Sequence, residues 1–101
     1  MNLNYFDAHS HLNFSQFDED RDEIIGEMKS LGIATICVGT DKKTSRESVE
    51  LASRYENIWA TIGLHPADTD EDFDESYYQS LITSRVVGVG ECGLDYYRLS
   101  E

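Results

Sequence analysis

Four short apolar runs, separated by longer polar stretches, dominate the pattern of this 101-residue chain. They occupy residues 3–8, 33–38, 58–63 and 86–91. The middle two runs are rich in β-branched residues and almost continuously apolar, which is typical of strands buried on both faces of a parallel sheet. The runs therefore predict four β-strands.

Apolar residues at helical spacing lie between these runs and predict three helices. In the first stretch they are followed by Gly32, a C-terminal stop signal, and are Ile24, Met28 and Leu31. The second stretch opens with a Thr-Ser-Arg-Glu segment at 44–47 that fits a capping box, and its apolar face consists of Val49, Ala52 and Tyr55. The third pattern, over residues 76–82, is weaker, and its apolar stripe consists of Tyr78, Leu81 and Ile82.

The resulting order βαβαβαβ indicates an α/β domain with right-handed crossovers. Two architectures fit this order, the doubly wound sheet and the (β/α)8 TIM-type barrel. A nucleotide-binding doubly wound fold would carry a Gly-rich loop after its first strand, where this chain has a histidine pair. A TIM-type barrel takes about 250 residues, or about 200 when compact. We therefore predict that residues 1–101 form the N-terminal half of such a barrel, with four strands and three helices, and that the rest of the barrel is absent from this sequence.

Residues able to carry chemistry follow three of the four predicted strands. His9 and His11 follow the first strand, His65 follows the third, and Glu91 ends the fourth. The carboxyl ends of parallel strands meet at one edge of the sheet, and sites in barrels and open sheets are built there. We therefore expect these four side chains to converge.

The histidine pair allows two interpretations. His9 and His11 are two residues apart at a strand end, so their imidazoles share a face and suit Zn, Mn, Fe or Ni. Alternatively, one is exposed to solvent and the other makes a structural hydrogen bond near the turn. Asp7 faces the same side as His9, so we expect its carboxylate either to accept a ring N–H of that histidine or to cap the loop.

Glu91 and His65 also allow two interpretations each. A carboxylate that closes a buried strand requires a positive partner. For Glu91 that partner is either a metal site, in which the carboxylate can bridge two ions, or a base such as Arg98. His65 would contact a substrate phosphate, position a water, or serve as a polar turn residue. The loop residues Asp95 and Tyr96 would orient the site or line a substrate cleft, unless they are ordinary loop residues.

Three sequence blocks together resemble the TatD family of metal-dependent deoxyribonucleases. They are Asp-Ala-His-Ser-His-Leu at 7–12, Gly-Leu-His-Pro at 63–66 and Gly-Glu-Cys-Gly-Leu-Asp-Tyr at 90–96. The resemblance covers essentially the whole chain. It implies a TIM-barrel hydrolase of the amidohydrolase type that cleaves phosphodiester bonds in DNA with two divalent metal ions (Mg, Mn or Zn).

The resemblance also implies a role for each matching residue. His9 and His11 would bind one metal ion, and Glu91 would bridge both ions. His65 would match a residue near the scissile phosphate. The family completes its site with two further histidines and an aspartate from later strands, whereas this sequence has no histidine beyond His65. We therefore expect weak or no catalysis from the isolated chain.

Two other functions are compatible with the same pattern. Other amidohydrolases also begin with two histidines after the first strand, but they cleave amides or deaminate bases and take a carboxylated lysine or a glutamate as the next ligand. No lysine ends the fourth strand here, so Glu91 favours phosphodiester hydrolysis. A non-catalytic half-barrel would instead self-associate or pair with a complementary half, because its sheet has two unpaired edges.

The charge and the cysteines restrict partners and location. A formal net charge of −12 excludes the basic footprint of a passive nucleic-acid binder, although bound divalent ions would reverse the charge at one spot for a DNA substrate. Cys37 and Cys92 form no CxxC motif, the N-terminus does not read as a signal peptide, and no apolar run approaches the roughly 20 residues that span a membrane. We expect a cytoplasmic protein without membrane contact, in which both thiols are at least half-buried.

Overall fold

A computed structural model describes residues 3–66 and 72–92 of the chain. Its elements follow in the order β1 (Tyr5–Ser10), the 3-10 turn η1 (Ser15–Phe17), α1 (Arg21–Ser30), β2 (Ile33–Val38), α2 (Lys42–Arg54), β3 (Ile58–Ile62), α3 (Glu75–Ser80) and β4 (Val86–Val89). The predicted order βαβαβαβ is therefore confirmed.

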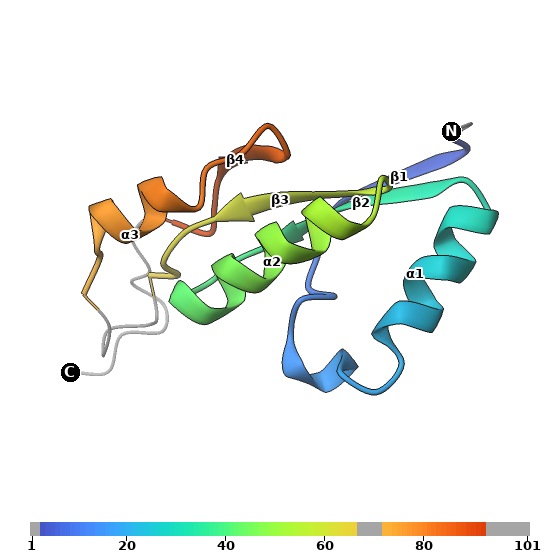
Figure 1. Cartoon of the computed structure of the whole chain (residues 1–101), viewed down its shortest axis with the longest axis horizontal. Coiled ribbons are helices and arrows are strands. Elements are labelled where there is room, and N and C mark those ends of the chain that lie inside the picture. Colours follow the sequence, from blue (N-terminus) through green and yellow to red (C-terminus); the bar gives the residue numbers. More distant parts are fainter. Residues whose placement is uncertain (1–2, 67–71, 93–101) are drawn as a thin grey trace.

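The four strands form one parallel sheet in the order β1-β2-β3-β4 (Figure 1). Each strand pairs with the next strand along the chain, and one of the three helices lies in each connection. In Figure 1, α2 runs alongside the sheet, while α1 lies next to the part of the sheet formed by β1 and β2. This topology places the carboxyl ends of all four strands at the same edge, as the sequence predicts.

The strand bounds differ from the predicted ones at the residues that matter most. β2 has the predicted bounds, whereas β1 begins and ends two residues later, so His9 lies inside the strand. β3 ends one residue earlier than predicted and β4 two residues earlier, so Glu91 lies two residues beyond its strand. The pairing of β1 with β2 also shifts register between Asp7 and Ser10. The apolar runs in the sequence therefore do not give the exact ends of β1 and β4.

The first helix ends where the sequence predicts. Gly32 has a φ of 72°, in the left-handed region that favours glycine, directly after the C-cap of α1. The predicted apolar face is wrong at Leu31, which is 61% exposed, whereas Ile25 is fully buried. Because Leu31 lies past the last helical residue, helical spacing no longer sets its direction.

The second helix begins earlier than predicted. Its N-cap is Asp41, whose carboxylate accepts the backbone N–H of Thr44 at 2.8 Å, while the Thr44 hydroxyl accepts the backbone N–H of Asp41 at 3.1 Å. The capping box thus spans 41–44 and not 44–47. The buried face also differs: Val49 and Tyr55 are only partly buried, and the fully buried residues are Ser45, Ser48, Leu51 and Ala52.

Two serines replace apolar residues on the buried face of α2 because their hydroxyls bond the backbone of the β3 end. Ser45 Oγ donates to the Gly63 carbonyl at 3.2 Å, and Ser48 Oγ shares its hydrogen between the Ser45 carbonyl at 2.7 Å and the Thr61 carbonyl at 3.1 Å. A buried hydroxyl that is hydrogen-bonded in this way carries little penalty. The serines thereby attach α2 to the part of β3 that leads toward His65.

The hydrophobic core lies between one face of the sheet and the helices α1 and α2. Its buried members come from β2, β3, both helices and the loop after β1, and are Leu12, Ile25, Cys37, Leu51, Ala52, Ile58 and Ala60. Burial raises the pKa of the Cys37 thiol above its ordinary value. Cys92 is exposed, so the expectation that both thiols are at least half-buried is wrong for this residue.

The third helix is shorter than its pattern predicts, and the outer strands are open. Tyr78 is buried in α3, but Ile82 lies beyond the helix and is 62% exposed. On the edge strands, Tyr5 is 72% and Val89 is 70% exposed, so burial on both faces is restricted to the middle of the sheet. No helix in the described ranges has the length and apolar character needed to cross a membrane.

Candidate metal centre

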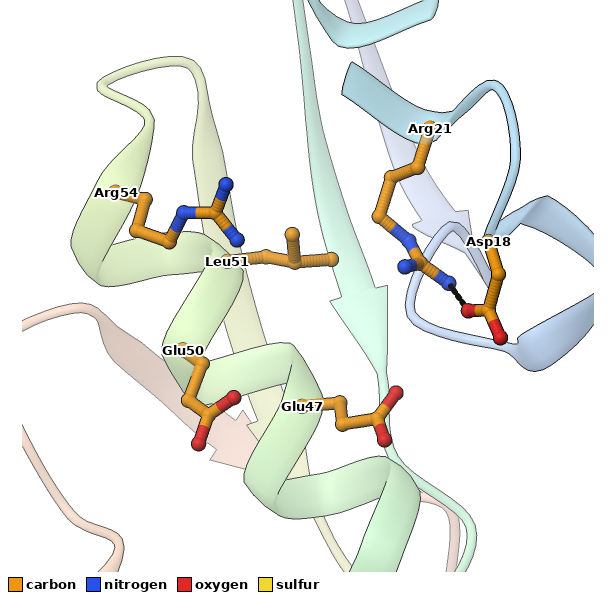
Figure 2. Close-up of a pocket in the computed structure, with 6 residues that line it drawn as sticks. All are labelled: Asp18, Arg21, Glu47, Glu50, Leu51 and Arg54. Carbon is orange, nitrogen blue, oxygen red and sulfur yellow. Dashed lines mark hydrogen bonds and ion pairs between the residues drawn. The ribbon is translucent and has the colours of Figure 1, made fainter.

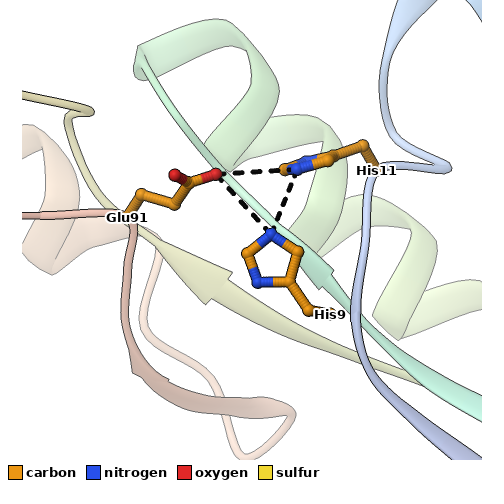
Figure 3. A group of neighbouring side chains, drawn as sticks. All are labelled: His9, His11 and Glu91. Carbon is orange, nitrogen blue, oxygen red and sulfur yellow. Dashed lines mark hydrogen bonds and ion pairs between the residues drawn. The ribbon is translucent and has the colours of Figure 1, made fainter. Parts of the chain in front are cut away.

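Three side chains meet at the carboxyl end of the sheet (Figure 3). The Nε2 atoms of His9 and His11 lie 3.2 Å apart. The Oε2 atom of Glu91 lies 3.7 Å from Nε2 of His9 and 3.6 Å from Nε2 of His11. These residues come from β1, from the turn that follows it and from the loop after β4, so the fold brings together positions about 80 residues apart.

The three donor atoms fit a divalent metal ion by type and spacing. Imidazole and carboxylate together suit Zn, Mn and Fe. A tetrahedral ion with ligand distances of about 2.0–2.2 Å separates its donors by about 3.3–3.6 Å. The observed separations of 3.2, 3.6 and 3.7 Å match that spacing closely. The donor set therefore fits a metal, and metal binding by these residues stays a prediction.

The backbone fixes which ring nitrogen of His11 faces the cluster. Its Nδ1 lies 3.2 Å from the carbonyl oxygen of Val38, which can only accept a hydrogen bond, so Nδ1 carries the proton. The Nε2 lone pair of His11 then points toward His9 and Glu91. The ring of Phe14 packs over the His11 ring at a centroid distance of 4.3 Å and limits its rotation. This arrangement leaves His11 ready to act as a ligand through Nε2.

His65 joins the cluster from the loop after β3. Its Nε2 lies 3.2 Å from Oε1 of Glu91, the carboxylate oxygen that does not face the His9–His11 pair. The two oxygens of Glu91 are thus directed toward different imidazoles. His65 is the least exposed of the three histidines, with 18% of its side chain accessible. The structure therefore places His65 beside the candidate metal ligands and does not decide between its proposed roles.

Backbone hydrogen bonds hold the loops that carry Glu91 and His65. The N–H of Glu91 donates to the carbonyl of Gly39 at 2.8 Å, and the N–H of His65 donates to the carbonyl of Thr40 at 2.7 Å. Gly63 lies directly against the Glu91 loop: a Cβ at this position would come within 2.7 Å of the Glu91 carbonyl oxygen. Only glycine allows this approach without displacing the loop.

Asp7 contacts His9 in a different way from the predicted one. Its carboxylate accepts the backbone N–H of His9 at 3.0 Å, where the sequence suggests a ring N–H. The register shift between Asp7 and Ser10 interrupts the strand alternation on which that expectation rests. Asp7 therefore shapes the backbone at His9, which corresponds to the loop-capping role that the sequence offers as the alternative. Asp95, Tyr96 and Arg98 lie outside the described residues, so their proposed roles stay predictions.

A charged cavity of about 180 Å³ lies apart from this cluster, between α2 and the segment before α1 (Figure 2). In it Arg21 pairs with Asp18 at 2.8 Å and also donates to the carbonyls of Leu12 and Phe14. The guanidinium thereby braces the loop that follows His11. Since its hydrogen bonds go to the backbone and to one exposed carboxylate, this arrangement is structural.

Reasoning from residue type and spacing missed several determinants of the site. They are the Val38 carbonyl, the Phe14 ring and the close approach at Gly63. The Gly63 position had a signal, since a glycine directly after a strand often marks a close backbone approach. Phe14, three positions after His11, has no sequence signal that distinguishes it from an ordinary core residue.

Comparisons with known proteins show which family the chain resembles. A family model described as TatD related DNase matches residues 6–101. A 3'-5' ssDNA/RNA exonuclease TatD from Cronobacter sakazakii is 38% identical over 97 residues, covering 92% of this chain and 37% of that protein. An uncharacterized metal-dependent hydrolase, YabD of Bacillus subtilis, is 39% identical over 98 residues, covering 91% of this chain and 38% of that protein.

A solved structure gives the same result for the fold. The TatD homologue YJJV from Escherichia coli superposes with a TM-score of 0.76 at 26% identity, covering 96% of this chain and 40% of that one. The βαβαβαβ unit thus corresponds to the N-terminal half of a TIM barrel, and the chain spans less than two-fifths of the length of the curated relatives above. The chain belongs to the family of TatD-related DNases, whose named members include metal-dependent hydrolases and nucleases.

Proposed function

We propose that this chain carries part of the active site of a metal-dependent nuclease that hydrolyses phosphodiester bonds in DNA. The observation that supports the proposal is the convergence of His9, His11 and Glu91 at metal-ligand spacing in a member of this family. A relative named as a 3'-5' single-stranded DNA/RNA exonuclease supports the choice of substrate. The cytoplasm is the proposed location.

We assign a role to each of these residues. His9 and His11 would hold one divalent ion through Nε2, and the Val38 carbonyl keeps the His11 proton on Nδ1. Glu91 directs its two oxygens to different imidazoles, which suits a carboxylate that bridges two ions. His65, on the far side of that carboxylate, would contact the substrate phosphate. Two divalent ions bound here would neutralise charge on the scissile phosphate and lower the pKa of the attacking water.

The overall charge fits a protein that binds DNA at one metal-dependent site and not over a broad surface. A net charge of −12 repels DNA over most of the molecule. The ions would create positive charge only where His9, His11 and Glu91 meet. Binding of DNA should therefore depend on the metal.

A chimera tests the proposal, since this chain spans only part of its relatives. The chain is joined to the portion of the Cronobacter sakazakii TatD relative that lies beyond the aligned 97 residues. We expect the chimera to cleave a fluorescent single-stranded oligonucleotide with Mg²⁺ or Mn²⁺ and to lose that activity on His11→Ala. A folded, metal-binding chimera that turns over a lactone or a dihydropyrimidine but no DNA would contradict the proposal.

A second candidate function is association with a second copy or with a complementary half-barrel. It is favoured by the open edge strands, where Tyr5 is 72% and Val89 is 70% exposed. Light scattering after size exclusion distinguishes the alternatives. A compact monomer with a sharp thermal transition would contradict this second function, because unpaired strands leave apolar surface exposed.

A further inference from the structure

Asn13 is fully buried two residues after the candidate ligand His11. Its Nδ2 donates to the carbonyl of Val38 at 3.1 Å and to the carbonyl of Thr44 at 2.8 Å. Both N–H groups of the amide are thus used on backbone oxygens. The reversed amide would place Oδ1 against those two oxygens, so the orientation of the side chain is fixed.

The Val38 carbonyl is shared between Asn13 and His11. It lies 3.1 Å from Nδ2 of Asn13 and 3.2 Å from Nδ1 of His11. A carbonyl oxygen has two lone pairs, so it can accept both hydrogen bonds. The position of this oxygen therefore decides whether His11 keeps its proton on Nδ1.

Asn13 also joins three elements around that carbonyl. It belongs to the turn after β1, Val38 ends β2, and Thr44 lies in the first turn of α2. Without the amide, nothing among the described side-chain hydrogen bonds ties the turn that carries His11 to both of these backbone oxygens. The anchor is thus specific to the end of the sheet where the cluster lies.

We propose that Asn13 is a positioning residue that holds the Val38 carbonyl against Nδ1 of His11 and so directs His11 Nε2 toward the metal. This inference rests on the proposed metal site. It assigns a part in metal binding to a residue that contacts neither the ion nor the substrate. Outer contacts of this kind are worth about 10–100-fold in metal affinity.

Asn57 provides a matched control at the opposite end of the sheet. It is also fully buried, and its Nδ2 donates to the carbonyl of Ile33 at 3.1 Å. The Oδ1 atoms of both asparagines lack a hydrogen-bond partner among the described residues. The two amides therefore sit in similar surroundings, and only Asn13 shares its acceptor with a histidine.

The experiment compares Asn13→Leu with Asn57→Leu in the full chain, since leucine matches the shape of asparagine and has no donor. Calorimetric titration with Mn²⁺ should give about 10–100-fold weaker binding for Asn13→Leu and unchanged binding for Asn57→Leu. Both variants should lower the unfolding midpoint. Asn13→Ala and Asn57→Ala form a second pair should leucine prevent folding.

The tautomer of His11 gives a readout that does not depend on metal. Nitrogen-15 NMR of the metal-free chain should show the proton on Nδ1 in the native protein and a mixture of tautomers in Asn13→Leu. An unchanged tautomer and unchanged Mn²⁺ affinity in a folded Asn13 variant would overturn the inference. Failure of the proposed metal site is a different result, because His11→Ala would then leave Mn²⁺ binding unaltered.

Discussion

The two ends of this sheet are built from opposite kinds of chemistry. At the carboxyl end, the side chains of His9, His11 and Glu91 point at one another, and each brings an atom that can bind a metal. At the amino end, Arg85 donates to the backbone carbonyls of residues 52, 55, 56 and 58, and its guanidinium lies 4.2 Å from the centre of the Trp59 ring. One end leaves donor atoms facing a common point, whereas the other uses its polar atoms to join segments.

The comparison predicts that metal binding and stability depend on opposite ends of one parallel sheet. In barrels the carboxyl end carries chemistry and the amino end carries stability. Variants at the amino end should therefore change the free energy of unfolding and spare metal affinity. Variants of the candidate ligand side chains at the carboxyl end should change metal affinity and spare the free energy of unfolding.

The largest effect is expected at the amino end, for Arg85→Met. This change keeps much of the packing on Trp59 but removes every hydrogen bond that the guanidinium makes to the backbone. Hydrogen bonds from a charged donor are strong, so the free energy of unfolding should fall by about 2–4 kcal/mol in urea titrations. Arg46→Met is the control, since Arg46 is exposed and its ion pair to Glu50 is 3.9 Å long. An Arg85→Met chain as stable as the control would contradict the assignment.

At the carboxyl end, Glu91→Gln removes the negative charge and keeps the shape. Mn²⁺ affinity measured by calorimetry should fall about 100-fold, while the metal-free chain keeps its unfolding midpoint. Glu56→Gln is the matched control, because Glu56 is exposed and pairs with Lys29 near the amino end. Equal Mn²⁺ affinity in the two variants would remove Glu91 from the site.

Gly63→Ala tests the contact that positions Glu91. The new Cβ would lie 2.7 Å from the Glu91 carbonyl oxygen, so the loop must move. We expect a loss of about 1–3 kcal/mol in stability and about tenfold in Mn²⁺ affinity. Gly88→Ala on the neighbouring strand meets only Thr61 Cγ2 at 3.8 Å and should change neither quantity by as much. Native metal affinity in Gly63→Ala would show that the close approach does not matter.

The smallest effect concerns an acidic group that has no part in metal binding. The backbone N–H of Tyr77 and the nearby Lys42 hold the pKa of Asp74 below its ordinary value of 3.8. Ionised Asp74 therefore stabilises the fold above that value, and the contribution disappears as the pH falls through its lowered pKa. The stability difference between native chain and Asp74→Asn should shrink in acid denaturation below about pH 4. Asp20→Asn is the control, since Asp20 makes no side-chain cap hydrogen bond; an equal pH response in both variants would refute the assignment.

Strand and helix order could be predicted from the sequence because apolar runs and helical spacing report burial directly. The bounds of β2 were predicted correctly, since every residue in it is at least half-buried. The buried face of α2 was not, because Ser45 and Ser48 gain burial through hydrogen bonds to β3 rather than through apolar character. The predicted stripe in the third helix failed at Ile82 because the helix ends before that residue.

The convergence at the site could be predicted to the extent that topology alone determines it. Placing His9, His11, His65 and Glu91 near one another requires only that parallel strands share a carboxyl edge. The finer arrangement depends on backbone atoms, such as the Val38 carbonyl beside Nδ1 of His11, which have no signature in residue type. The register shift after Asp7 likewise redirects its carboxylate to the backbone, and strand alternation does not foresee it.

The most direct measurement is an anomalous difference map from crystals of the chain soaked in Mn²⁺. The account predicts a peak within ligand distance of Nε2 of His9, Nε2 of His11 and Oε2 of Glu91, and no such peak in His11→Ala crystals. A peak at another place would contradict the claim that this end of the sheet is a metal site. The absence of any peak at a Mn²⁺ concentration that saturates the calorimetric titration would contradict it as well.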